Sequence, residues 1–354
     1  MSTAVSVVLF VAITAYAVFG GADFGAGFWD LAAGGTERGA RPREVIDRSI
    51  GPVWEANHVW LIFCFVLLWT GFPEAYASIW LTMFVPLTIA ALGIVLRGSG
   101  FAFRKAVFRE SSRRNFGAAF ASSSVLVPFC LGAIAGGIAS GRVPVGGVAA
   151  DPVGSWLNPT SILGGVLAVV VVAFLASVYL VREAATLDDA EMVEYFRRRA
   201  IGAAVVAGAV SLAGLFVLRA DAPYLFDGLR TRGLPLVLAS VGCGVAALVL
   251  LARARQRGAR LLAIAAVASI VLAWGVAQWD YVLPTTLTID DAAAPSGTLA
   301  ALLVATGLAA VIVLPAFVLL FSLEQRGILE HEGEDADADE REDDGEPAGS
   351  GRTS

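Results

Sequence analysis

Residues Gly51–Gly71 read GPVWEANHVWLIFCFVLLWTG, and this stretch decides the class of fold. No residue from Val59 to Gly71 is charged, so the run stays apolar to its end. A helix needs about 20 predominantly apolar residues to cross the hydrocarbon core of a bilayer. We therefore interpret Val53–Gly71 as a transmembrane helix that carries Glu55 and His58 near its start.

The whole chain shares this apolar character. Of its 354 residues, 57% are hydrophobic and only 16% are charged, with a mean hydropathy of +0.74. Soluble globular proteins carry about 25% charged residues, so a bilayer is the solvent that fits and no nucleic-acid partner is expected. The net charge of −6 derives largely from residues 330–354. We predict a transmembrane domain over 1–325 and an acidic, disordered cytoplasmic tail over 326–354.

Nine apolar runs are long enough to span the membrane, which predicts an all-α polytopic fold. Each span is expected to be helical, because lipid offers no partner to open backbone groups. The predicted spans are Thr3–Gly21, Val53–Gly71, Ala77–Leu96, Phe116–Ala139, Ser161–Val181, Ala200–Leu218, Leu234–Ala252, Leu261–Trp279 and Thr298–Phe321.

The distribution of basic residues predicts the orientation. Of the 25 Lys and Arg, only Arg142, Arg219, Arg230 and Arg232 follow even-numbered spans; all others follow odd-numbered ones. Loops rich in Lys and Arg remain in the cytoplasm. The N-terminus is therefore predicted to lie outside and the C-terminus inside.

Glu55 is the acidic residue that most needs an explanation, because it lies roughly one turn inside the cytoplasmic end of its span. A charged side chain at mid-membrane costs about 2.5–3.5 kcal/mol on insertion scales, and less near the interface. Burial also lets a glutamate hold or release a proton near neutral pH. Glu55 and His58 are three residues apart and share a helix face. Two roles stay open from the residues alone: the inner mouth of a proton path, or an ion pair with an arginine such as Arg48.

Other polar residues are weaker candidates. A lone histidine such as His58 more often makes a hydrogen bond than ligates heme. Asp23 and Asp30 are seven residues apart in GGADFGAGFWD and share a face if the first helix continues. We expect Asp23 to be a polar site near the membrane and Asp30 to be a solvated residue of the inner loop. The segment Gln278–Ala294 is expected to form a structured outer loop.

Several of these stretches together resemble subunit II of the cytochrome bd quinol oxidases. The resemblance rests on GGADFGAGFWDL, IGPVWEANHVWLI, LRGSGFAFR and PTTLTIDDAAAPSGTL, which occur in the family's order between Met1 and about Gln325. The nine-span plan with its N-terminus outside agrees with the family.

The resemblance implies a fold of two four-helix bundles plus one peripheral helix. It also implies a bacterial cytoplasmic-membrane complex that oxidises quinol and reduces dioxygen to water. In that family, two b-type hemes and one d-type heme lie in the larger partner, subunit I, and subunit II ligates none of them. The resemblance leaves room for small accessory subunits and for a structural quinone bound in this chain.

The same resemblance assigns roles to individual residues. Glu55, with Trp54 and Asn57 as its matching neighbours, takes the place of an acid on the route that brings cytoplasmic protons to the oxygen-reducing heme. His58 shares its helix face, and Asp23 is a candidate polar support. Arg97 and Arg104 match basic positions of the family and are further candidates for polar support; the alternative is that they only hold the helix end at the inner surface. The family usually has an acid where this chain has Ala102.

Two other functions compete with an oxidase subunit. A proton-coupled secondary transporter predicts broken helices in matching halves and polar residues near the membrane midplane. A purely structural membrane scaffold predicts no part in proton movement.

Overall fold

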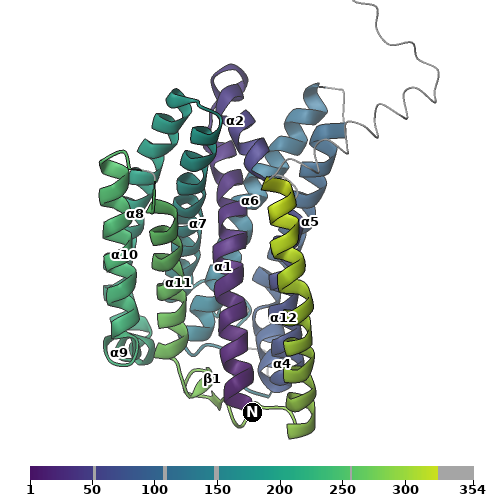
Figure 1. Ribbon diagram of the computed structural model, residues 1–354. Helices are drawn as coiled ribbons and strands as arrows, with labels where there is room; N and C mark the ends of the chain where they lie inside the picture. Colours follow the sequence, from purple (N-terminus) through teal and green to yellow (C-terminus); the bar gives the residue numbers. More distant parts are fainter. Residues whose placement is uncertain (51–52, 107–109, 147–150, 256, 326–354) are drawn as a thin grey trace, which may run out of the picture. The chain divides into compact units, whose positions relative to one another are not determined.

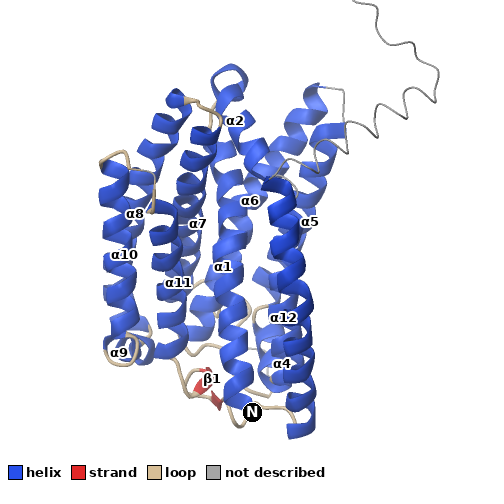
Figure 2. Ribbon diagram, viewed as in Figure 1, coloured by secondary structure: helices blue, strands red, loops and turns tan. Residues whose placement is uncertain are grey.

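The computed structural model describes residues 1–50, 53–106, 110–146, 151–255 and 257–325. The predicted acidic tail 326–354 lies outside this description. So do the side chains of residues 36, 50, 53–57, 101, 104–106, 110–115, 314, 317–318 and 320–325. The chain divides into two units, 1–299 and 300–354. The described part is mostly helical, as the sequence predicts, and it also contains one short hairpin that the sequence does not predict (Figure 2).

The helices follow one another along the chain with few long connections (Figure 1). They are α1 (Ser2–Ala32), α2 (Thr36–Ile50), α3 (Val53–Gly71), α4 (Pro73–Thr82), α5 (Phe84–Ala106), α6 (Glu110–Ala139), α7 (Pro159–Thr186), α8 (Ala190–Asp221), α9 (Pro223–Arg230), α10 (Leu234–Ala252), α11 (Ala259–Ala277) and α12 (Ser296–Gln325). The hairpin pairs β1 (Tyr281–Leu283) with β2 (Leu287–Thr288) in antiparallel register, Tyr281 opposite Thr288.

By length and apolar composition, seven helices of the described part are able to cross a membrane. The number rises to eight if the bent pair α3–α4 counts as one span. The multi-pass membrane character predicted from the sequence is therefore confirmed.

The predicted span Ala77–Leu96 is wrong as a single helix, because the chain breaks at Met83 between α4 and α5. Pro86 lies in the first turn of α5, where its missing N–H costs no helical hydrogen bond. The Met83 side chain is fully buried at the break. The apolar part of α5, Phe84–Gly100, is shorter than a full span by the same criteria.

The fold contains two sharp bends of the same kind, each between a long helix and a short helix that begins at a proline. α3 and α4 meet at a bend of 118°, where Phe72 (φ −138°, ψ 63°) precedes Pro73. α8 meets α9 in the same way, where Ala222 (φ −138°, ψ 62°) precedes Pro223. A residue before proline is driven out of the helical region, so each long helix ends there and a short helix starts at the proline.

Two groups of long helices can be distinguished among α1–α11. In the first, α1 packs against α3 and α6, and α5 packs against α6. In the second, α7 packs against α8 and α11, and α10 packs against α8 and α11. The two four-helix bundles that the resemblance implies stay a prediction. The groups meet where α1 crosses α7 and where α6 crosses α7.

Glycines permit the close crossing between the groups. A Cβ on Gly25 of α1 would overlap the carbonyl oxygen of Val172 and lie 2.6 Å from the Cβ of Ala176, both on α7. Small residues of this kind let membrane helices approach backbone to backbone. Gly25 therefore lets α1 pack closely against α7.

The segment Gln278–Ala294 is structured, as predicted. The backbone N–H of Ala294 donates to the carbonyl oxygen of Gly71 (2.9 Å), which ties the segment to the end of α3. Arg232 donates to the carbonyl oxygen of Trp279 (2.8 Å) and to Asp280 Oδ2 (3.0 Å). A further hydrogen bond from Arg232 to the Tyr224 hydroxyl raises the pKa of the guanidinium.

The connection after α1 is a helix, which the sequence analysis treated as a loop. α2 buries Val45 and Ile46 against a cluster that includes Phe196. Arg41 pairs with Asp189 Oδ2 at 3.0 Å, just before α8. α2 therefore lies across the end of the bundle where α1 ends and α3 begins (Figure 1).

Candidate functional site

The position of Glu55 follows from α3, which begins at Val53. The side chains of Trp54, Glu55 and Asn57 lie outside the described residues, so the structure does not test their predicted roles. Arg48, the alternative partner of Glu55, has its Nη2 3.7 Å from Glu44 Oε1 on the same helix.

His58, one turn further along α3, is described and half-buried. Its ring meets the ring of Phe24 edge to face, with 6.0 Å between the centroids. Phe24 also contacts the guanidinium of Arg97, whose Cζ lies 4.8 Å from the ring centroid. Phe24 therefore connects the start of α3 to a charged pair deeper in the bundle.

That pair is formed by Asp23 on α1 and Arg97 on α5. Arg97 Nη2 lies 2.6 Å from Asp23 Oδ1 and also donates to the carbonyl oxygen of Asp23 (3.0 Å). The side chain of Asp23 is 4% exposed and that of Arg97 is 1% exposed. The charge of Arg97 is therefore neutralised inside the bundle and not at a surface.

Residues of α6 complete the surroundings of Arg97. Its Nη1 donates to Ser124 Oγ, and its Cζ lies 4.4 Å from the ring centroid of Phe120. A Cβ on Gly27 would lie 2.5 Å from the Ser124 Cβ and 3.0 Å from Arg97 Nη1. Gly27 thus leaves the space in which the guanidinium and the serine hydroxyl meet. Sequence analysis missed Ser124, because an isolated serine in an apolar run carries no signal.

The hydrogen-bonding capacity of this cluster is only partly used. Asp23 Oδ2, Arg97 Nε and the Tyr16 hydroxyl are buried and have no hydrogen-bond partner among the described residues. Buried polar atoms of this kind are commonly satisfied by ordered water. The cluster of Tyr16, Asp23 and Arg97 is therefore suited to hold water between α1 and α5.

Asp30 is buried, whereas the sequence predicts a solvated residue of the inner loop. α1 continues to Ala32, which keeps Asp30 in the helix with a side chain only 5% exposed. Its Oδ1 lies 2.6 Å from Arg43 Nε of α2. Packing of α2 over the end of α1 buries a carboxylate that the sequence alone leaves at the surface.

Residues 102–104 of α5 correspond to the family's acidic and basic positions after the third span. Ala102 and Phe103 are exposed, and the Phe103 ring lies 5.3 Å from the Phe116 ring of α6. The Arg104 side chain lies outside the described residues. Within the described ranges, no group of three or more His, Cys, Asp and Glu is placed to hold a metal ion.

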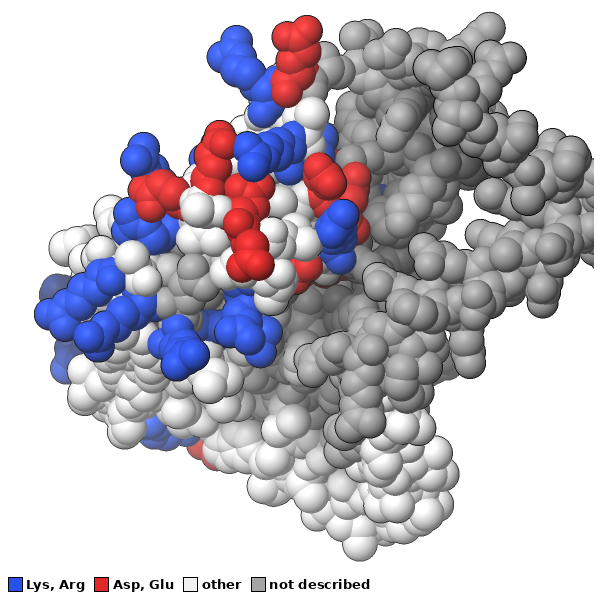
Figure 3. Space-filling model, turned by 45° about the horizontal axis from the view of Figure 1, so that its top comes forward, with Lys and Arg blue, Asp and Glu red and all other residues white. Residues whose placement is uncertain are grey.

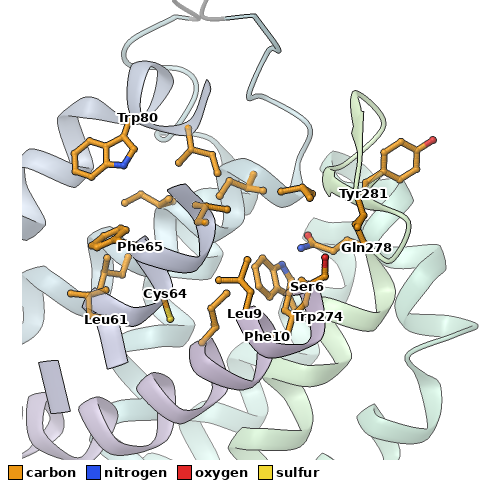
Figure 4. Close-up of a pocket in the computed structure, with 18 of the residues that line it drawn as sticks. Ser6, Leu9, Phe10, Leu61, Cys64, Phe65, Trp80, Trp274, Gln278 and Tyr281 are labelled. Atoms are coloured by element: carbon orange, nitrogen blue, oxygen red, sulfur yellow. The ribbon is translucent and has the colours of Figure 1, made fainter. Parts of the chain in front are cut away.

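A second feature is an apolar cavity of about 180 Å³ toward the other end of α1. Figure 4 shows side chains from α1, α3, α4 and α11 around it. Ser6 Oγ and Gln278 Oε1 lie at one end, and neither has a hydrogen-bond partner in the described part of the chain. The cavity thus offers a long apolar wall and two polar groups.

Comparison with known proteins gives the same family over nearly the whole described chain. The family described as cytochrome bd terminal oxidase subunit II matches residues 1–323. Cytochrome bd ubiquinol oxidase subunit 2 of Bacillus subtilis (strain 168) is 32% identical over 151 residues, which cover 41% of this chain and 43% of that protein. Cytochrome bd-I ubiquinol oxidase subunit 2 of Escherichia coli (strain K12) is 26% identical over 179 residues, covering 48% and 45%. The chain therefore aligns with less than half the length of these two curated relatives.

The fold supports the same relationship. A chain from the structure of bd oxidase from Geobacillus thermodenitrificans superposes with a TM-score of 0.73 at 25% sequence identity. The superposition covers 91% of this chain and 98% of that chain. With the family match extending from residue 1 to 323, this chain belongs to the cytochrome bd terminal oxidase subunit II family.

Proposed function

We propose that the chain is subunit II of a cytochrome bd-type quinol oxidase in the bacterial cytoplasmic membrane. The observation that carries this proposal is the family match over residues 1–323, together with the shared fold. The reaction is oxidation of quinol coupled to reduction of dioxygen to water. The two b-type hemes and the d-type heme belong to subunit I, the partner of this chain.

The proposal includes nine membrane crossings with the N-terminus outside. Seven candidate spans, the bent pair α3–α4 and the shorter apolar helix α5 together account for nine. The basic loops support the orientation, because they follow α1, α5, α7 and α10 at one end of the bundle. In this orientation α2 and the start of α3 face the cytoplasm.

Protons consumed in forming water would enter through this cytoplasmic end. Glu55 would accept them at the start of α3, with Trp54 and Asn57 beside it in sequence and His58 one turn further in. The unsatisfied atoms of Asp23 and Arg97 support a hydrated interior next to that turn. Quinol releases its protons on the outer side, so the reaction separates charge without a pump.

The apolar cavity lined by Ser6 and Gln278 suits the structural quinone that the resemblance leaves room for. Its aliphatic and aromatic wall fits an isoprenoid chain, and the two polar side chains fit the oxygens of a ring. In this role the molecule fills space and carries no electrons.

The transporter alternative is less well supported. An inverted repeat would place matching helix breaks at opposite ends of the bundle. The α3–α4 and α8–α9 corners instead lie at the same end (Figure 1).

Co-purification tests the proposed function directly. We expect the tagged chain, extracted from its native membrane in mild detergent, to bring with it a heme-bearing polypeptide and quinol-dependent oxygen uptake. Absorption spectra of the purified material measure the heme. Recovery of the chain alone, from membranes that still contain active oxidase, would contradict the proposal.

Glu55→Ala tests the proton path. We expect oxygen uptake by the purified complex to fall at least about tenfold, because a lost proton-transfer group commonly costs more than this. Heme content should stay unchanged, and Glu55→Asp should recover much of the rate. Glu44→Ala on the exposed face of α2 is the matched control and should be near wild type. Full activity of Glu55→Ala would exclude the proton role, while loss of heme would favour a scaffold.

A further inference from the structure

The turn between α10 and α11 concentrates positive charge. Arg253, Arg255, Arg257 and Arg260 occur in the stretch RARQRGAR, which contains no acid, and all four are exposed. Positive φ angles at Ala254 (53°) and Gly258 (89°) reverse the chain within this short connection. The arginines are therefore held close together at the ends of two apolar helices.

Among the described residues, the acids near this end of the molecule pair with other arginines. Arg197 and Arg198 share Glu194 at 2.6 and 2.7 Å, and Arg41 pairs with Asp189. Arg253, Arg255 and Arg257, by contrast, form no ion pair with any residue that the structure describes. Figure 3 shows basic side chains gathered along one edge of this end of the molecule with no acidic ones among them.

The three arginines are also not needed to complete the end of α10. Arg197 of α8 already donates from Nη1 to the carbonyl oxygen of Leu251 (3.0 Å). The backbone N–H of Arg253 donates to the carbonyl oxygen of Val249, and that of Arg255 donates to the carbonyl oxygen of Leu250. Capping of the helix therefore leaves the guanidinium groups of the turn available.

An apolar stripe leads along α10 to this turn. Leu238, Val241, Val245 and Val249 are between 40% and 61% exposed, and their spacing of three or four residues places them on one face. Arg253 follows Val249 by four residues. From Leu238 to Arg253 the stripe is about 22 Å long, more than the depth of one leaflet of a hydrocarbon core about 30 Å thick. The stripe has no aromatic anchor of the kind that protein interfaces favour.

We propose that the α10–α11 turn binds the phosphate headgroup of an anionic phospholipid, whose acyl chain lies along the exposed stripe of α10. Guanidinium groups bind phosphate through paired hydrogen bonds, which makes Arg253, Arg255 and Arg257 the headgroup contacts. Arg260 stacks on Tyr179, with its Cζ 5.4 Å from the ring centroid, and closes the side of the site toward α7. The inference does not depend on the proton path, because it uses none of its residues.

Lipid binding to the purified complex tests this site. Native mass spectrometry of the detergent-solubilised complex is titrated with cardiolipin, phosphatidylglycerol or phosphatidylcholine. We expect both anionic lipids to bind wild type at least about tenfold more tightly than phosphatidylcholine. The R253Q/R255Q/R257Q variant should lose on the order of 10- to 100-fold of that affinity. The matched control R38Q/R41Q/R182Q removes three exposed arginines elsewhere and should stay within about twofold of wild type.

Two further variants separate the contribution of the acyl-chain contact to lipid affinity from that of the arginine charge. V245N, in the stripe, should weaken cardiolipin binding while leaving any binding of inorganic phosphate unchanged. R253K/R255K/R257K keeps the charge and should retain part of the affinity, which guards against a folding defect in the glutamine variant. If the control variant lost as much affinity for the anionic lipids, the effect would come from the total charge of the protein and not from this site, and the proposal would be wrong. Binding of inorganic phosphate without any binding of phospholipid, or an acidic polypeptide occupying the turn in the complex, would overturn the proposal.

Discussion

Replacing Arg97 with leucine is expected to lower the free energy of unfolding by about 3–5 kcal/mol, the usual cost of removing one partner of a buried ion pair. The substitution leaves the carboxylate of Asp23 almost fully buried without its counter-charge. It also removes the donor to Ser124 and the contact with the Phe120 ring. Denaturant titration of the purified complex, followed by the loss of helical circular dichroism, measures the change.

The double variant Asp23→Leu/Arg97→Leu separates charge from packing. With both charges gone, no buried ion remains, so most of the loss should be recovered. Arg38→Leu, at an exposed position of α2, is the control and should change stability by no more than about 0.5 kcal/mol. A double variant as unstable as Arg97→Leu alone would show that shape, and not charge, makes the site fragile.

Gly25→Ala is the second substitution with a large expected effect, at about 3 kcal/mol, near the upper end of the usual cost of overpacking. The added methyl group would overlap the carbonyl oxygen of Val172, which belongs to the backbone of α7 and has no rotamer to adopt. α1 would therefore have to move away from α7, which opens the contact between the two helix groups. Thermal unfolding and the yield of assembled complex measure the effect.

Gly208 provides a matched control for Gly25→Ala, and Ala176 provides a second substitution that should restore only part of the lost stability. Gly208 on α8 has no atom within 4 Å of an added Cβ, so Gly208→Ala should be neutral or slightly stabilising. Ala176→Gly in the Gly25→Ala background removes the 2.6 Å contact but not the overlap with Val172. Only partial rescue is expected, and full rescue would place the conflict at the side chain instead of the backbone.

The polar candidates show how far sequence reasoning reaches in a membrane protein. Asp23 was identified as a polar site because a carboxylate near an apolar run is costly in lipid. Arg97 was also a candidate, but its pairing with Asp23 was not predicted, because Arg97 follows an apolar run and equally fits an arginine at the membrane interface. Asp30 was misjudged for a related reason: α2 reads as a charged loop, yet it folds back and buries Asp30 against Arg43. Each error concerns a contact between two different helices, which a local sequence pattern does not record.

The sequence by itself determined the solvent of this protein, the number of apolar runs, the helical state of nearly all of them and the likeness to one family. These are local properties, since a segment in lipid must satisfy its own backbone hydrogen bonds whatever its neighbours do. Only the tertiary structure decided the break at Met83, the pairing of Asp23 with Arg97 and the close crossing at Gly25. These features depend on where separate helices meet, and in a bilayer that is set by shape and by the few polar groups that require partners, which no hydropathy pattern encodes.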